Sequence, residues 1–144
     1  MAKEISYLHE ITVFLSNESG KLFEMLSLIR DNDIALKSIS VAQTNEYGLV
    51  ALLVDKADKC LSLLKENGYD VSDSKVLAVK VLETQPETLF DLAEILAAHE
   101  INIEYLYTTV SKKNTIMIVK VNESEKAQET LLDYGFNIID KNEL

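Results

Sequence analysis

The chain is poor in several residue types, and each shortage excludes a class of protein. Its 144 residues include one cysteine, Cys60, which excludes an internal disulfide and a cluster of thiolate metal ligands. One proline and four glycines, beside 47% apolar residues, exclude a low-complexity disordered chain. No run of 18 residues is free of charge, so no membrane-spanning helix is expected. The N-terminus also lacks the pattern of a signal peptide. We therefore expect a cytoplasmic protein without a membrane partner.

Basic residues are also scarce. The chain has 14 lysines and arginines against 24 acidic residues, and its formal net charge is −10. Nucleic-acid binding depends on clustered basic side chains that neutralise phosphates. Arg30 is the only arginine, and the one adjacent basic pair, Lys112 and Lys113, has the pattern of a solvated hairpin tip. We therefore expect no nucleic-acid partner.

The most informative feature that is present is an internal repeat. The chain matches itself when it is shifted by 67 positions, so that segment 22–26 falls on 89–93 and segment 65–69 falls on 132–136. Gly68 falls on Gly135, which aligns two of the four glycines at one offset. Such self-similarity indicates a duplication. We expect two domains, residues 1–73 and 74–144, with a short joint near residues 72–75.

Both halves show the same order of periodic segments. An alternating strand pattern is followed by a helical stripe, two strands around a turn, a second helix and a short last strand. In the first half the segments are 8–16, 20–32, 35–43, 49–54, 56–66 and a strand from residue 69. In the second half they include strands 103–110 and 115–121, helix 124–133, a strand from residue 136, and the first-helix stripe Leu89, Leu92, Ala93 and Leu96. The second helix of each half stops at a glycine, as helices often do.

The order βαββαβ, present twice, predicts the α+β class, with two four-stranded antiparallel sheets that each carry two helices on one face. The central strands are apolar on both faces; Val50 and Leu52, for example, alternate with Ala51 and Leu53. Exposed surfaces of this kind promote aggregation. We expect the halves to cover these surfaces against each other and against a second copy, which makes a homodimer the expected assembly.

Two motifs carry a resemblance to a known family. Segment 17–22, Asn-Glu-Ser-Gly-Lys-Leu, resembles the Asn-x-Pro-Gly-x-Leu signature of ACT domains and lies where that signature lies, between the first strand and the first helix. The family's later pattern of an acidic residue, Lys-Ala, a leucine and Gly-aromatic is similar to segment 125–136. The resemblance covers nearly the whole chain and leaves no catalytic domain. It implies tandem ferredoxin-like βαββαβ (ACT) units in an allosteric regulatory protein that binds a free amino acid at the interface between ACT units.

The resemblance also implies site residues, carried over position by position. Most are in the loop after the first strand, with weaker candidates on the second strand: Asn17, Glu18, Ser19, Gly20, Lys21, Leu22, Ile39 and Ser40. The equivalent, weaker positions of the second copy are Gln85, Pro86, Glu87, Thr88 and Leu89, with Tyr105 and Tyr107.

Physical chemistry supports the first loop independently of the resemblance. The opening N–H groups of a helix have no intrahelical partner, and with the helix dipole they attract a carboxylate. Gly20 has no Cβ, so a ligand can approach the backbone closely. The Asn17 amide can serve either charge of a zwitterion. Asn17 is also a good helix cap and Gly20 a good turn residue, so a purely structural reading stays open.

The loops depart from the signature in two ways. Ser19 stands where the family usually has proline, and Glu87 stands where it has glycine. Segment 84–87 has the pattern of a capping box, in which the Glu87 carboxylate would occupy the place of a ligand carboxylate. We therefore expect the first loop to be the better ligand site. The acidic and tyrosine side chains favour a ligand with donors in its side chain, such as histidine or serine.

Enzymatic readings find little support. His9 and His99 occupy non-equivalent places outside any catalytic or metal motif, and a small buried thiol is expected at Cys60. We expect no catalytic residues, no metal site and no cofactor. The alternative reading is a ligand-free dimerisation or interaction module that acts on an enzyme or transporter.

Overall fold

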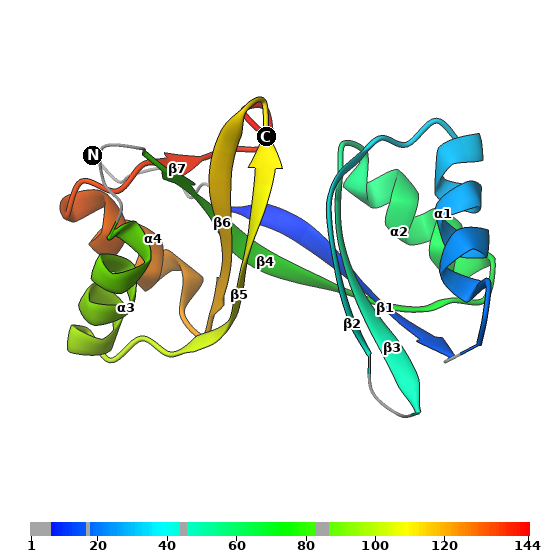
Figure 1. The fold of residues 1–144 in the computed structure, drawn as a ribbon, viewed down its shortest axis with the longest axis horizontal. Helices are drawn as coiled ribbons and strands as arrows, with labels where there is room; N and C mark the ends of the chain where they lie inside the picture. Colours follow the sequence, from blue (N-terminus) through cyan, green and yellow to red (C-terminus); the bar gives the residue numbers. More distant parts are fainter. Residues whose placement is uncertain (1–6, 17, 44–45, 83–86) are drawn as a thin grey trace. The chain divides into compact units, whose positions relative to one another are not determined.

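The computed structural model describes residues 7–16, 18–43, 46–82 and 87–144. Among these residues, four helices and seven strands follow one another in the predicted order (Figure 1), except that one long strand stands where the last strand of the first half and the first strand of the second half were expected. They are β1 (Leu8–Ser16), α1 (Lys21–Asp31), β2 (Leu36–Gln43), β3 (Tyr47–Val54), α2 (Ala57–Glu66), β4 (Asp70–Val81), α3 (Thr88–Ala98), β5 (Ile103–Ser111), β6 (Asn114–Val121), α4 (Ser124–Asp133) and β7 (Ile138–Ile139). The predicted α+β class is confirmed.

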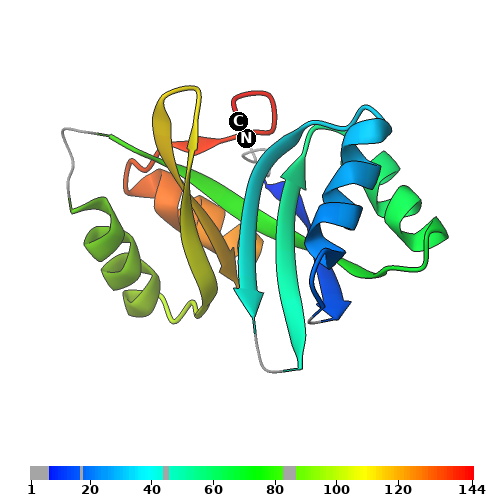
Figure 2. The same cartoon turned by 45° about the vertical axis from the view of Figure 1, so that its right-hand side comes forward.

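Internal contacts divide the chain into two units. His9–Ser74 form the first unit, and Lys75–Leu144 form the second unit together with Tyr7 and Leu8. The strand order is β2-β3-β1-β4 in the first unit and β5-β6-β4-β7 in the second. Figure 2 shows the paired ribbons β2 and β3 beside α1, and β5 and β6 in the other unit. Each unit therefore has the split βαβ arrangement.

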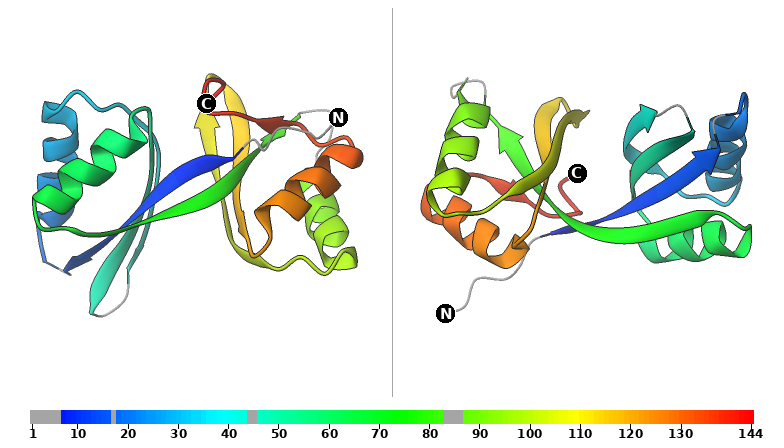
Figure 3. Two further views of the ribbon diagram at one scale, coloured as in Figure 1. Left: turned by 180° about the vertical axis from the view of Figure 1, so that it is seen from behind. Right: turned by 90° about the horizontal axis from the view of Figure 1, so that it is seen from below.

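Strand β4 runs through the predicted joint between the halves. The segment Ser72–Lys75 is not a linker, because β4 runs through it as one strand of twelve residues (Figure 3). Its first part is the last strand of the first unit, and its second part is the first strand of the second unit. The segment contains neither glycine nor proline to interrupt an extended backbone. The two predicted domains, 1–73 and 74–144, remain a prediction.

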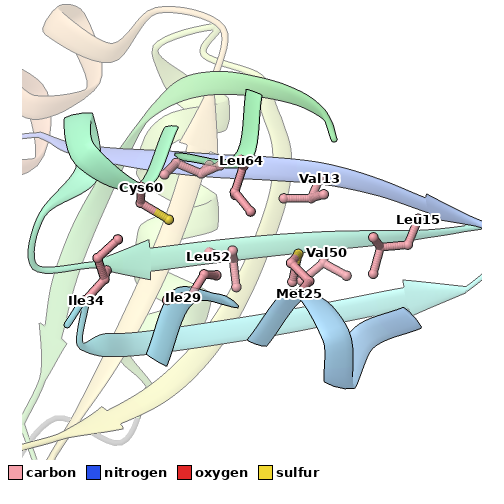
Figure 4. Close-up of a cluster of buried hydrophobic side chains, with 10 residues drawn as sticks. Val13, Leu15, Met25, Ile29, Ile34, Val50, Leu52, Cys60 and Leu64 are labelled. Carbon is pink, nitrogen blue, oxygen red and sulfur yellow. The ribbon is translucent and has the colours of Figure 1, made fainter. Parts of the chain in front are cut away.

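The core of the first unit lies between its sheet and its helices. Alternate residues of β1, Ile11, Val13 and Leu15, are buried with Val50 and Leu52 of β3. Helix α1 contributes Met25 and Ile29, and α2 contributes Cys60 and Leu64 (Figure 4). Leu22 and Leu26 pack at the margin of this cluster. The predicted helical stripe is confirmed.

The core of the second unit repeats this plan with one correction. Leu92 and Leu96 of α3 are buried as predicted, but Leu89 is 51% exposed and Ala93 is also exposed. Helix α3 begins at Thr88, and its buried residues are Thr88, Leu92 and Leu96. Because these positions define the inward face, Leu89 lies outside it. The remaining core residues come from β4, β6 and α4 and from the turn before β5: Leu77, Val79, Ile101, Met117, Val119, Val121, Ala127 and Leu131.

Candidate functional site

The loop between β1 and α1 is open to solvent. Glu18, Ser19 and Gly20 are exposed, and the Glu18 N–H donates to the Ser16 carbonyl at 2.8 Å. Gly20 is the N-cap residue of α1, and no side chain of the described residues caps this helix. The first intrahelical donor is the N–H of Glu24, which reaches the Gly20 carbonyl at 3.0 Å. The helix start is therefore not closed by the loop's own described side chains. Asn17 lies outside the described residues.

Gly20 is required by backbone geometry. Its φ is +87°, in the left-handed region, while a Cβ built there would meet no heavy atom within 4 Å. A side chain at this position would therefore be opposed by backbone strain and not by crowding. The space beside the residue is open to a ligand.

The same loop carries both signs of charge. The Lys21 Nζ lies 3.8 Å from a Glu18 carboxylate oxygen and 3.6 Å from one of Glu24. All three side chains are at least 40% exposed. Pairs of this length and exposure are weak. The ammonium and the carboxylates therefore remain available to an incoming zwitterion.

The two candidates on β2 do not adjoin this loop within the first unit. Ile39 is paired with Leu52, which is paired with Ile11. Ile11 precedes Ser16 by five residues, which is about 16 Å of strand. Ser40 is the next residue along β2, so its side chain points to the opposite sheet face. These residues can share a site with the loop only if the loop comes from another unit.

The second loop differs from its prediction. Helix α3 begins at Thr88, so Glu87 is the N-cap residue and its side chain makes no capping hydrogen bond. The predicted capping box puts Glu87 inside the helix, whereas the described helix begins one residue later; the other positions of the box, 84–86, lie outside the described residues. Thr88 is buried and Leu89 is exposed, while Gln85 and Pro86 lie outside the described residues.

The two predicted tyrosines stand apart from that loop. Tyr105 and Tyr107 stack on β5, with ring centroids 6.4 Å apart and planes 14° apart. Tyr107 pairs with Ile118, which alternates with the core residues Met117 and Val119. The tyrosines therefore lie on the sheet face opposite the helices.

A groove that sequence reasoning did not find lies beside α3. Its volume is about 540 Å³, and its walls come from α3 and from the end of α4. We call it the α3 groove. Its lining residues are Glu87, Thr88, Asp91, Glu94, Ile95, Tyr134, Gly135 and Phe136. The sequence separates its two walls by some 40 positions, so no local pattern could join them.

Both histidines contact other groups of the chain, and the cysteine is buried. The His9 Nδ1 lies 3.0 and 3.2 Å from the Asp73 carboxylate oxygens, and the His99 Nδ1 lies 2.9 Å from the Ile95 carbonyl. Burial, with the nearby Asp55 carboxylate, raises the pKa of Cys60 to about 11. Among the described residues, no group of three or more histidine, cysteine or acidic side chains is placed to hold a metal ion. In the same part of the chain, no helix combines the length and apolar character needed to cross a membrane.

Comparison with solved structures finds the same fold. A protein from Bacteroides thetaiotaomicron has a TM-score of 0.88 at 22% identity, over 96% of this chain and 95% of that chain. The ligand-free regulatory subunit of aspartate kinase from Thermus thermophilus has a TM-score of 0.65 at 17% identity, over 93% and 96% of the two chains. Aspartate kinase from Clostridium acetobutylicum matches over 89% of this chain but 33% of its own, with a TM-score of 0.56 at 14% identity.

Comparison with family models is more specific. No curated protein matches the chain. The model described as an ACT domain pair matches residues 6–144, which is nearly the whole sequence. The match agrees with the repeated βαββαβ order and with the loop signature at the start of α1. The chain therefore belongs to the ACT domain pair family.

Proposed function

We propose that this protein is a non-catalytic regulatory sensor that binds a free amino acid at the loop between β1 and α1, where ACT units meet. The observation that carries the proposal is the start of α1 behind Gly20, which no side chain of the described residues caps, next to Lys21 and two exposed carboxylates. A zwitterion needs partners of both signs a few ångströms apart, and this loop offers both.

The chemistry of the loop suggests how an amino acid would be held. The ligand carboxylate would accept hydrogen bonds from the N–H groups that open α1, with Lys21 as a second cationic partner. The ligand ammonium would lie near the Glu18 carboxylate. Donors on the ligand side chain would find acceptors on the remaining carboxylate, which favours ligands such as histidine or serine. Ile39 and Ser40 would contribute from another unit, because the register keeps them from the loop of their own unit.

The regulatory role follows from where the ligand would bind. A ligand held between units stabilises the arrangement that binds it best, so occupancy changes how those units pack. Two of the structural relatives are, by their own descriptions, a regulatory subunit of aspartate kinase and an allosteric aspartate kinase. We infer by analogy of fold that this chain reports amino-acid supply to a partner enzyme or transporter.

A thermal-shift screen over the twenty amino acids tests the proposal. A ligand that binds only the folded state raises the melting temperature; at a hundred times its Kd it adds about 2.7 kcal/mol of stability. We expect one amino acid, or a few with polar side chains, to give such a shift. Glu18→Gln and Lys21→Gln should each weaken binding about tenfold, because each removes a charged partner.

Glu87→Gln is the matched control in the second loop, and it should leave the affinity unchanged. Loss of the shift in this variant alone would instead place the ligand at the second loop. A ligand set that is exclusively aliphatic would contradict the expected side-chain donors. A flat response across the panel from a stable dimer would overturn the sensor proposal and favour the ligand-free interaction module.

A further inference from the structure

The α3 groove has the character of a docking surface. Its apolar wall is formed by Ile95, Phe136 and the Tyr134 ring, and the whole Tyr134 residue is 58% exposed. That ring is held in place by His99, whose ring meets it edge-on at a centroid distance of 5.7 Å. Helices α3 and α4 lie side by side in Figures 1 and 3, and the groove follows α3 on this flank. Exposed aromatic surface that is held rigid at a groove is typical of an interaction site.

The charge of the groove has one sign. Glu87, Asp91 and Glu94 line the same flank of α3 at spacings of four and three residues, and all three are exposed. In the described part of the chain, none of these carboxylates takes part in an ion pair. Seven residues of helix span about 10 Å, so the negative charges are spread along the groove. Because the described residues hold no metal-binding group, this spread suits an occupant with several cations and not a single ion.

The duplication shows that the fold does not require these residues. Their equivalents in the first unit lie 67 positions earlier. The three carboxylates are replaced there by a glycine, a glutamate and a serine, Thr88 by a lysine and the tyrosine by asparagine: Gly20, Lys21, Glu24, Ser27, Leu28, Asn67, Gly68 and Tyr69. The helix dipole favours acidic residues in the first turn, which accounts for Glu87 and Asp91. It does not account for Glu94, which lies beyond that turn.

We propose that the α3 groove docks a basic segment of another protein, in which lysine or arginine side chains flank an apolar residue. The apolar residue would pack on Ile95 and Phe136, and the cations would lie beside Asp91 and Glu94 and over the face of Tyr134. The net charge of −10 would attract such a segment from a distance. This surface is distinct from the proposed amino-acid loop on α1, so either proposal can fail without the other.

Fluorescence anisotropy with a synthetic peptide tests the proposal on the full chain. The probe is an amphipathic peptide of lysines and leucines, compared with one that has glutamates for lysines and one that has serines for leucines. The first peptide should bind, and the other two should not. Asp91→Asn with Glu94→Gln should weaken binding about fivefold, because two charge pairs are lost. Tyr134→Ala, which leaves the charge unchanged, should also weaken it several-fold.

Matched variants in the first unit separate the groove from general charge attraction. Asp58→Asn with Glu66→Gln removes the same charge from exposed sites of α2, and Phe23→Ala removes an aromatic residue that is 69% exposed. Both should bind the peptide as the wild type does. Glu87 is left unchanged, because it is also one of the weaker predicted ligand residues.

Three results would overturn the proposal. Equal losses in the groove and control variants would show that the peptide follows net charge alone. Amide chemical shifts that change on peptide binding only outside residues 87–95 and 134–136 would place the contact elsewhere. An increase in mass by light scattering that is lost in Asp91→Asn with Glu94→Gln would show that the groove is filled by a second copy of this chain.

Discussion

Cys60 illustrates how one residue responds to its surroundings. Its side chain is fully buried in the first core, and burial holds the pKa of the thiol near 11 instead of 9.0. The thiolate is the reactive form of cysteine. Although a lone cysteine is sometimes a nucleophile, this one is protonated and covered at neutral pH, as the sequence suggested. The equivalent residue of the second unit, Ala127, is also buried.

The stability of the protein should therefore fall with pH in a defined window. The unfolded thiol ionises near pH 9.0 and the folded thiol near 11, so unfolding releases a proton between these values. The contribution of Cys60 is fully present below pH 9.0 and is lost as the pH rises towards 11. Urea unfolding at a series of pH values measures this, with Cys60→Ala as the control, which should show a weaker decline. Reaction of the native thiol with a disulfide reagent at pH 8 without prior unfolding would contradict the burial.

At the scale of the element, all four helices end in the same way. The third residue beyond each helix donates its N–H five residues back, as in the bonds from Tyr69 to Leu64 and from Ile101 to Leu96, at 3.0 and 2.9 Å. This is the Schellman motif, which places the intervening residue in the left-handed region. After α2 and α4 this left-handed position is held by Gly68 and Gly135, which adopt positive φ with little strain. After α1 and α3 it is held by Asp33 and Glu100, with φ of 59° and 58°. The glycine ends were predicted; the acidic ends were not, because local propensity disfavours them.

Glu100→Gly should consequently stabilise the protein by roughly 0.5–1 kcal/mol, because glycine adopts positive φ without the strain of a Cβ. Chemical denaturation measures the change. The control is Glu129→Gly inside α4, at an exposed position with ordinary helical geometry. There the same substitution should destabilise by about 1 kcal/mol. A loss of stability in both variants would show that Glu100 makes a contact worth more than its backbone strain.

At the scale of the whole molecule, the first unit ends in an apolar edge strand. Strand β2 is last in the strand order, and Leu36, Ile39 and Val41 on it are 41%, 37% and 50% exposed. An edge strand with exposed aliphatic side chains favours pairing with another chain unless it is covered. This favours the homodimer that the apolar strands predicted.

Light scattering should therefore give a mass of twice 16.2 kDa for the wild type. Val41→Lys should shift the equilibrium towards the monomer, because it places a charge on the edge strand. Val110→Lys is the matched control on β5, the edge strand of the second unit, where valine is 70% exposed. A monomeric wild type would contradict the prediction, and dissociation by Val110→Lys alone would place the contact on β5.

The sequence by itself determined the duplication, the order of elements, most of the core and the family, because periodic patterns and turn residues act over a few neighbouring positions. It also located the loop at Gly20, whose left-handed backbone a local motif specifies. Only the tertiary structure decided that β4 runs unbroken through 72–75, that Leu89 faces away from the core, and that strand register separates Ile39 from its own loop. It alone assembled the α3 groove from α3 and Tyr134, because strand pairing and helix packing, not local preference, bring distant segments together.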